Sequence, residues 1–297
     1  MEKRPSSSGA GTTPFHRSVS YLLFKWHIYD NKGSYNGWFD WLPEWMRVGY
    51  WSPIAIAFII SFYSSLFLYM PPLEFPVTQT DDFWWWADAA VFTWGVFVVV
   101  QATVSKGSLH AFYVSYTGWS WLILTARAGL SAAAPLLKSH PALATWVETL
   151  GSSLHFPTAV AAVITFTIWN FVLFPIIYFK AMPPGESRDN FLRFNFSFFM
   201  INIHVLNLPL ALVNTVYGDG ARLFSLSDLW VGYLVVMLYS MLYLFVLDRL
   251  GLHFYPMFCP RSAACGISMG LVLVLYYYLM DWGNALITYL QPMLARD

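Results

Sequence analysis

Charged residues are scarce in this chain of 297 residues: Asp, Glu, Lys and Arg together make up 11% of the sequence, whereas hydrophobic residues make up 58%. Soluble domains carry roughly 25% charged residues. The deficit therefore excludes an ordinary soluble domain and indicates a protein that crosses a membrane several times. The formal net charge is zero, so we expect no basic surface of the kind that binds nucleic acid.

Cysteine is equally scarce. The two cysteines, Cys259 and Cys265, fall close together with His253 nearby, but a structural zinc site needs four nitrogen or sulfur ligands. We interpret them as free thiols in a reducing compartment, with palmitoylation as the alternative. The sequence therefore indicates neither a metal site nor a cofactor.

The N-terminal region lacks an early apolar core, so the sequence shows no cleavable signal peptide. We expect residues 1–47 to form a cytoplasmic tail. Within this tail, the aromatic and acidic run Trp38–Trp45 is expected to lie on the membrane surface. Residues 48–297 are expected to form the transmembrane domain.

Long apolar runs, by contrast, are abundant. A membrane-spanning helix needs about 20 mostly apolar residues. Seven segments meet this requirement, at about 48–70, 84–104, 115–137, 153–179, 194–217, 228–247 and 264–290. The sequence therefore predicts an all-α polytopic membrane bundle of about seven transmembrane helices.

The distribution of Lys and Arg predicts the orientation of these helices. Most of these residues lie in the N-terminal tail and in the loops after the second, fourth and sixth spans. The opposite side holds only Lys138, Arg222 and Arg296. Because Lys and Arg accumulate on the cytoplasmic side, we expect a cytoplasmic N-terminus in the endoplasmic reticulum or the plasma membrane.

One histidine, His204, lies deep in the fifth apolar segment, and no charged residue lies between Arg193 and Asp219. An ionisable side chain is costly in lipid, so it usually faces the protein interior and has a function. Thr125 lies about as far into the third segment, so both would sit roughly 15 Å deep. A neutral imidazole can take the proton of a threonine hydroxyl that attacks a carbonyl carbon. Thr125 and His204 are therefore a candidate nucleophile and base.

Structural interpretations stand beside these functional ones. A threonine in a membrane helix commonly bonds the carbonyl four residues earlier, and a histidine often links two helices. Asn207 shares a helix face with His204 and either orients the imidazole, donates to an oxyanion or bonds another helix. Arg127 either holds the carboxylate of a lipid, snorkels, or pairs with Asp248 or a carbonyl. Rival hydroxyls in other segments belong to Thr165, Thr167, Ser197 and Ser240.

Several short motifs occur together. Trp121–Thr125 resembles the Trp-x-x-Leu-Thr motif of the androgen-induced/androgen-dependent family of multi-pass membrane hydrolases. Asp189–Phe191 resembles the Asp-Asn-Phe of that family, and His204 with a proline five residues later resembles its catalytic histidine motif. Gly251–Pro256 is similar to its Gly-x-x-x-Tyr-Pro. Trp169 and Tyr178 also fit a family pattern, and the matches keep the family's order over about 84–290.

The resemblance implies a threonine hydrolase that cleaves fatty acid esters of hydroxy fatty acids taken from the bilayer. Thr125 would be the nucleophile and His204 the second catalytic residue, in six family-like spans plus one N-terminal span. Three features depart from the family: the N-terminal tail and span up to about Asp82 are additional, Val205 stands where the family has Thr, and Leu247-Asp248 stands where it has His-His.

Two other functions fit parts of the sequence. A b-type haem carrier would need two histidines at one depth, whereas the expected depths of the four dispersed histidines differ; these are His110, His155, His204 and His253. A non-enzymatic seven-span transporter or receptor is the second alternative. The expected cytoplasmic N-terminus argues against the common receptor orientation, and no pair of broken helices points to a transporter.

Overall fold

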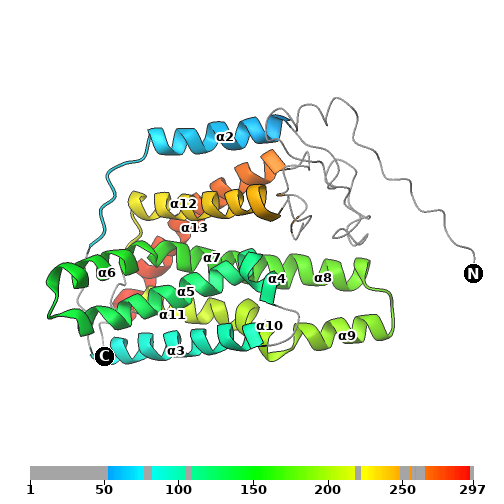
Figure 1. Ribbon diagram of the computed structural model, residues 1–297, viewed down its shortest axis with the longest axis horizontal. Helices are drawn as coiled ribbons and strands as arrows, with labels where there is room; N and C mark the ends of the chain where they lie inside the picture. Colours follow the sequence, from blue (N-terminus) through cyan, green and yellow to red (C-terminus); the bar gives the residue numbers. More distant parts are fainter. Residues whose placement is uncertain are drawn as a thin grey trace, which may run out of the picture. The chain divides into compact units, whose positions relative to one another are not determined.

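The computed structural model describes residues 53–76, 82–104, 109–217, 222–247, 255, 258 and 265–294. All regular secondary structure in these ranges is helical (Figure 1). The prediction of an all-α membrane bundle is therefore confirmed. The predicted tail over residues 1–47, with its aromatic segment, lies outside the described residues.

Each of the seven predicted segments is helical. The helices in chain order are α2 (Pro53–Leu68), α3 (Asp82–Val104), α4 (Leu109–Val114), α5 (Tyr116–Ala133), η2 (Ala134–Leu137), α6 (Pro141–Ser153), α7 (His155–Thr167), η3 (Ile168–Leu173), α8 (Phe174–Ile176), η4 (Ile177–Ala181), α9 (Glu186–Asn195), α10 (Phe198–Ile201), η5 (Asn202–Leu206), α11 (Asn207–Tyr217), α12 (Leu226–Leu242), η6 (Tyr243–Leu247) and α13 (Cys265–Leu294).

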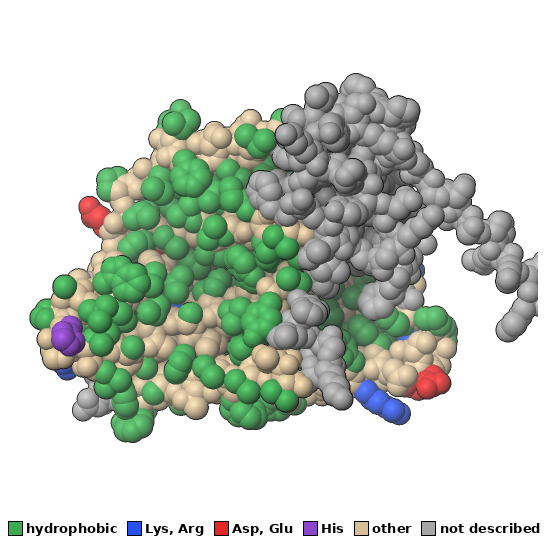
Figure 2. Space-filling model, in the orientation of Figure 1, with side chains coloured by type: hydrophobic (Ala, Val, Ile, Leu, Met, Phe, Trp, Pro, Cys, Tyr) green, Lys and Arg blue, Asp and Glu red, His purple; other side chains and the backbone are tan. Residues whose placement is uncertain are grey.

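Five continuous helical stretches in the described ranges are long and apolar enough to cross a membrane. They are Phe83–Val104, Tyr116–Leu137, Pro141–Lys180, Phe198–Val216 and Cys265–Leu290. Shorter apolar helices cover Ile59–Leu68 and Leu226–Leu242. Figure 2 shows hydrophobic side chains over much of the described surface and only a few charged ones. Such a surface suits contact with lipid, and the chain is a multi-pass membrane protein.

The fourth span begins earlier than the sequence predicts. Residues 138–152 were expected to form a loop, whereas the helix begins at Pro141 and α6 continues almost directly into α7. Proline is well suited to the first turn of a helix, because its missing N–H would be unpaired there anyway. At the other end, Met182 is extended, with φ −87° and ψ 123°. A residue that precedes a proline disfavours the helical conformation, so the helix ends before Pro183.

The fifth span begins a few residues later than predicted. The amphipathic helix α9 ends at Asn195, and the span starts at Phe198. The Ser197 hydroxyl accepts a hydrogen bond from the backbone N–H of Met200 at 3.4 Å. This serine cap sets the start of the span.

The described helices belong to two compact units. The smaller comprises Met1–Tyr69 and Met237–Leu273, and the larger comprises Met70–Val236 and Val274–Asp297. In the larger unit, α5 is central and packs against α3, α6, α7 and α11. The four candidate site residues Thr125, Arg127, His204 and Asn207 belong to this larger unit.

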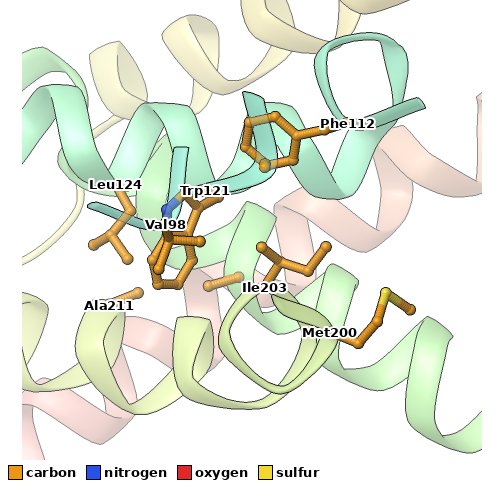
Figure 3. Close-up of a cluster of buried hydrophobic side chains, with 9 residues drawn as sticks. Val98, Phe112, Trp121, Leu124, Met200, Ile203 and Ala211 are labelled. Atoms are coloured by element: carbon orange, nitrogen blue, oxygen red, sulfur yellow. The ribbon is translucent and has the colours of Figure 1, made fainter. Parts of the chain in front are cut away.

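A buried apolar cluster joins these helices inside the larger unit. Figure 3 shows Trp121 and Leu124 of α5 near Val98 of α3, together with Ile203 and Ala211 of the fifth span. The indole N–H of Trp121 donates to the Gly95 carbonyl of α3 at 3.2 Å. Small residues such as Gly95 allow membrane helices to approach closely.

Candidate active site around His204

His204 lies in η5, which is a π-helical turn, and its side chain is only 5% exposed. Its ring stacks on the indole of Trp169, which lies in a second π-helical turn, η3. The ring centroids are 4.2 Å apart and the planes differ by 20°. Among the described residues, Nδ1 of His204 makes no close hydrogen bond, although the imidazole interacts with the backbone of Met200, four residues earlier. Because π-helical turns are rare and occur frequently at functional sites, this pair is the centre of the candidate site.

Asparagine side chains hold both π-helical turns in place. The Asn170 amide donates to the carbonyl of His204 at 3.0 Å and to that of Phe166 at 2.8 Å. The Trp169 indole N–H donates to Asn195 Oδ1 at 2.7 Å. The imidazole therefore packs against an indole whose position is set by a further hydrogen bond.

Thr125 is buried on α5, but its side chain faces α3. The hydroxyl donates to the Trp121 carbonyl at 2.8 Å, and a methyl group placed on Gly95 of α3 would clash with it. This is the ordinary bond of a membrane threonine to the carbonyl four residues earlier. Among the described residues, no hydrogen bond joins Thr125 to His204.

Asn207 is buried and bonds α5 at a different residue. Its amide donates to the Ser120 hydroxyl at 2.8 Å, which confirms the interpretation of Asn207 as a link between helices. At 100° per residue, Ser120 lies about 140° around α5 from Thr125. The face of α5 that meets the fifth span is therefore that of Ser120, which the sequence analysis did not single out.

Arg127 is buried inside the larger unit, with an exposed fraction of 5%. Its guanidinium interacts electrostatically with the buried carboxylate of Asp88 on α3. Asp88 also accepts a hydrogen bond from the Asn214 amide of α11. The interpretation that Arg127 snorkels is therefore wrong, and the alternative partner Asp248 lies outside the described residues.

Asp88 and Asn214 were also missed by the sequence analysis. The sequence does carry a signal for Asn214: it follows Asn207 by seven residues, just as Arg127 follows Ser120 by seven. Seven residues make about two helical turns, so each pair occupies one helix face.

An apolar groove of about 630 Å³ lies on α3. Its lining consists of Trp86, Ala89, Ala90, Thr93, Trp94 and Phe97. The indole N–H of Trp94 donates to Asn202 Oδ1 at 2.7 Å, and Asn202 lies two residues before His204. Trp94 therefore lines the groove and also contacts η5.

The described ranges contain no group of three or more His, Cys, Asp or Glu that could hold a metal ion. Two of the four histidines of the haem alternative can be placed. His155 Nε2 lies 3.3 Å from the Thr215 carbonyl, whereas His204 packs on Trp169. The side chains of His110 and His253 are not among those described.

Comparisons of the chain with protein-family models, with curated proteins and with solved structures found no match. The resemblance to the androgen-induced/androgen-dependent family therefore rests on the motifs alone.

Proposed function

We propose that this multi-pass membrane protein is a carboxylic ester hydrolase for lipids of the bilayer, with fatty acid esters of hydroxy fatty acids as its substrate class. The observation that carries the proposal is His204: a buried imidazole in a π-helical turn that packs against a second one, whose Nδ1 makes no close hydrogen bond among the described residues. A general base needs a nitrogen that is free to take a proton. The motif resemblance around Thr125, His204 and Gly251–Pro256 supplies the reaction class.

In the proposed reaction, the Thr125 oxygen attacks the ester carbonyl carbon while His204 takes the hydroxyl proton. The imidazolium then protonates the leaving alkoxide, and an acyl-threonine remains. Water hydrolyses this ester, with His204 again as the base, which releases the fatty acid and restores the hydroxyl.

The proposal requires a movement of Thr125. Its hydroxyl must leave the Trp121 carbonyl, to which it donates at 2.8 Å, before it can approach His204. Ser120 is a competing nucleophile, because its hydroxyl already accepts a hydrogen bond from Asn207, which lies three residues after His204. The experiment below separates the two.

The groove on α3 offers a place for an acyl chain. Its lining is mostly aromatic and apolar, and it is connected to the surroundings of η5 through Trp94 and Asn202. A lipid that enters sideways from the bilayer would keep its chain in this groove while its ester approaches His204.

The test uses purified protein in nanodiscs, with the variants Thr125→Ala, Ser120→Ala and His204→Ala. Thr103→Ala is the matched control, because this exposed threonine makes the same type of bond, to the Val99 carbonyl at 2.8 Å. We expect Thr125→Ala and His204→Ala to lose about 100-fold or more of the lipid esterase rate. Thr125→Ala should lose labelling by a fluorophosphonate probe completely, whereas His204→Ala should be labelled slowly. Full activity in both variants would refute the proposal, and loss of labelling in Ser120→Ala alone would make Ser120 the nucleophile.

A further inference from the structure

Buried polar side chains form a column along the interior of the larger unit. They lie on α5, α7 and the fifth span, most of them three or seven residues apart, which keeps them near one face of each helix. The members of this polar column are Ser120, Arg127, His155, Thr158, Thr165, His204, Asn207, Asn214 and Thr215. From His155 in α7 to Trp169 in η3 the helical stretch rises about 21 Å, so the column extends along part of the larger unit.

Contacts between helices join members of the column at separate levels. At the end where α7 begins, His155 lies against the Thr215 carbonyl and interacts electrostatically with Arg127. About 10 Å further along, Ser120 and Asn207 bond each other. The next groups along the column are Thr165 and then His204, which packs on Trp169.

One level between these groups is mainly apolar. Leu124 and Ala211 belong to the buried apolar cluster and lie between the two polar levels of α5 and α11. Thr158 supplies the polar group at this level of α7, where its hydroxyl bonds the Leu154 carbonyl at 2.7 Å. Thr158 is therefore the member of the column at this level.

Most members of the column carry a polar atom that has no hydrogen-bond partner among the described residues. Some are donors, some are acceptors and some can act as either; they are Arg127 Nε and NH1, Asn207 Oδ1, Asn214 Oδ1, His155 Nδ1, His204 Nδ1, Thr165 Oγ1 and Thr215 Oγ1. Buried polar groups are normally paired with protein or with ordered water. A bound anion would satisfy the donors alone, whereas water donates and accepts.

The charges of the column also favour water over an anion. Asp88 offsets the positive charge of Arg127. The nearby Arg222 is already paired with Asp228, at 2.6 Å. An added anion would leave a negative charge without a counter-charge in the membrane interior, which is costly, and a neutral water molecule avoids that cost.

We propose that the polar column is hydrated and conducts water from the end of the larger unit where α7 begins to His204. The purpose of this water path rests on the proposed function, whereas its existence does not. Hydrolysis of the acyl-threonine consumes one water molecule, which must reach a site buried among apolar helices.

Hydroxyl-radical labelling by X-ray radiolysis tests the proposal, because radicals form from water bound beside a side chain. The protein in nanodiscs is mixed with ¹⁸O-water before exposure, and modified residues are identified by mass spectrometry. We expect ¹⁸O labelling at His155 and His204. Trp121 and Phe156 are the controls: both are as deeply buried, and both are reactive aromatic residues outside the polar column. Labelling of His155 and His204 no stronger than that of Trp121 would overturn the proposal.

The variant Thr158→Val tests the path. Valine keeps the shape of threonine but removes the hydroxyl, so we expect loss of labelling at His204 and unchanged labelling at His155. Retained labelling at His204 would overturn the path. Because labelling requires no catalysis, an active protein with an unlabelled column would refute hydration alone, and a labelled column in a protein without esterase activity would refute the proposed function alone.

Discussion

At the scale of single residues, the contact between Gly95 and Thr125 determines how closely α3 approaches α5. The Gly95 carbonyl accepts the indole N–H of Trp121, and the Thr125 side chain lies directly over the glycine. There is no room for a methyl group between them, so the same glycine that admits the close contact also holds Thr125 against α3.

We therefore expect Gly95→Ala to lower the free energy of unfolding by about 1–3 kcal/mol, as overpacking of a core does. Thermal unfolding in detergent measures this effect. The double variant Gly95→Ala/Thr125→Ala should recover part of the loss, because Thr125→Ala removes Oγ1 and Cγ2, the two atoms nearest the added methyl group, and keeps only Cβ. A Gly95→Ala variant as stable as the wild type would contradict this close contact.

At this scale the sequence was informative for His204 and uninformative for Ser120. An imidazole in an apolar run is conspicuous because burying it is costly. A serine costs little there, so Ser120 carries no such signal. Thr125 was identified from its depth and from motif resemblance, and neither depends on the direction of its side chain.

At the scale of single elements, several hydrogen bonds to Asp228 stabilise the first turn of α12. The buried carboxylate of Asp228 accepts hydrogen bonds from two Arg222 nitrogens at 2.6 and 2.7 Å. It also accepts the backbone N–H of Ser225 at 2.7 Å. Asp228 lies three residues after Ser225 and closes a capping box with it. The same carboxylate therefore caps the helix and neutralises the charge of Arg222.

Removing one partner of a buried ion pair costs about 3–5 kcal/mol, and Asp228→Asn removes the charge while it keeps the shape. We expect this variant to unfold at a clearly lower temperature in detergent. Asp281→Asn is the control, because it makes the same change on the exposed face of α13 and should alter stability by about 0.5 kcal/mol or less. Equal melting temperatures for the two variants would show that the pair contributes nothing.

The existence of the helices was predictable and some of their boundaries were not. Apolar composition over about 20 residues places a span, and all seven segments are helical. Residues 141–152 are less apolar than a span, so hydropathy assigned them to a loop although they continue the fourth helix. The π-helical turns that surround His204 have no hydropathy signal at all.

At the scale of the whole molecule, the prediction of seven spans places the two termini on opposite sides of the membrane. The excess of Lys and Arg predicts a cytoplasmic N-terminus. A split fluorescent reporter with its complementing fragment in the cytoplasm should therefore give signal at the N-terminus and none at the C-terminus.

A reporter inserted at Gly185 should also give signal, because this turn precedes α9 on the predicted cytoplasmic side. Gly185 has φ 95°, and nothing lies within 4 Å of its missing Cβ. Signal at both termini would show that one of the shorter helices, α2 or α12, does not cross the membrane.

The sequence alone determined that this is a helical, multi-pass membrane protein with one conspicuous histidine, because hydropathy and burial cost are summed along a segment. Which polar groups meet was decided only by the tertiary structure. Each residue turns a side chain by about 100° around its helix, so helix packing decides that Asn207 meets Ser120 and that Arg127 meets Asp88. The depth of a side chain in the membrane can be estimated from its position along the chain, whereas the neighbour that it faces depends on how the helices pack.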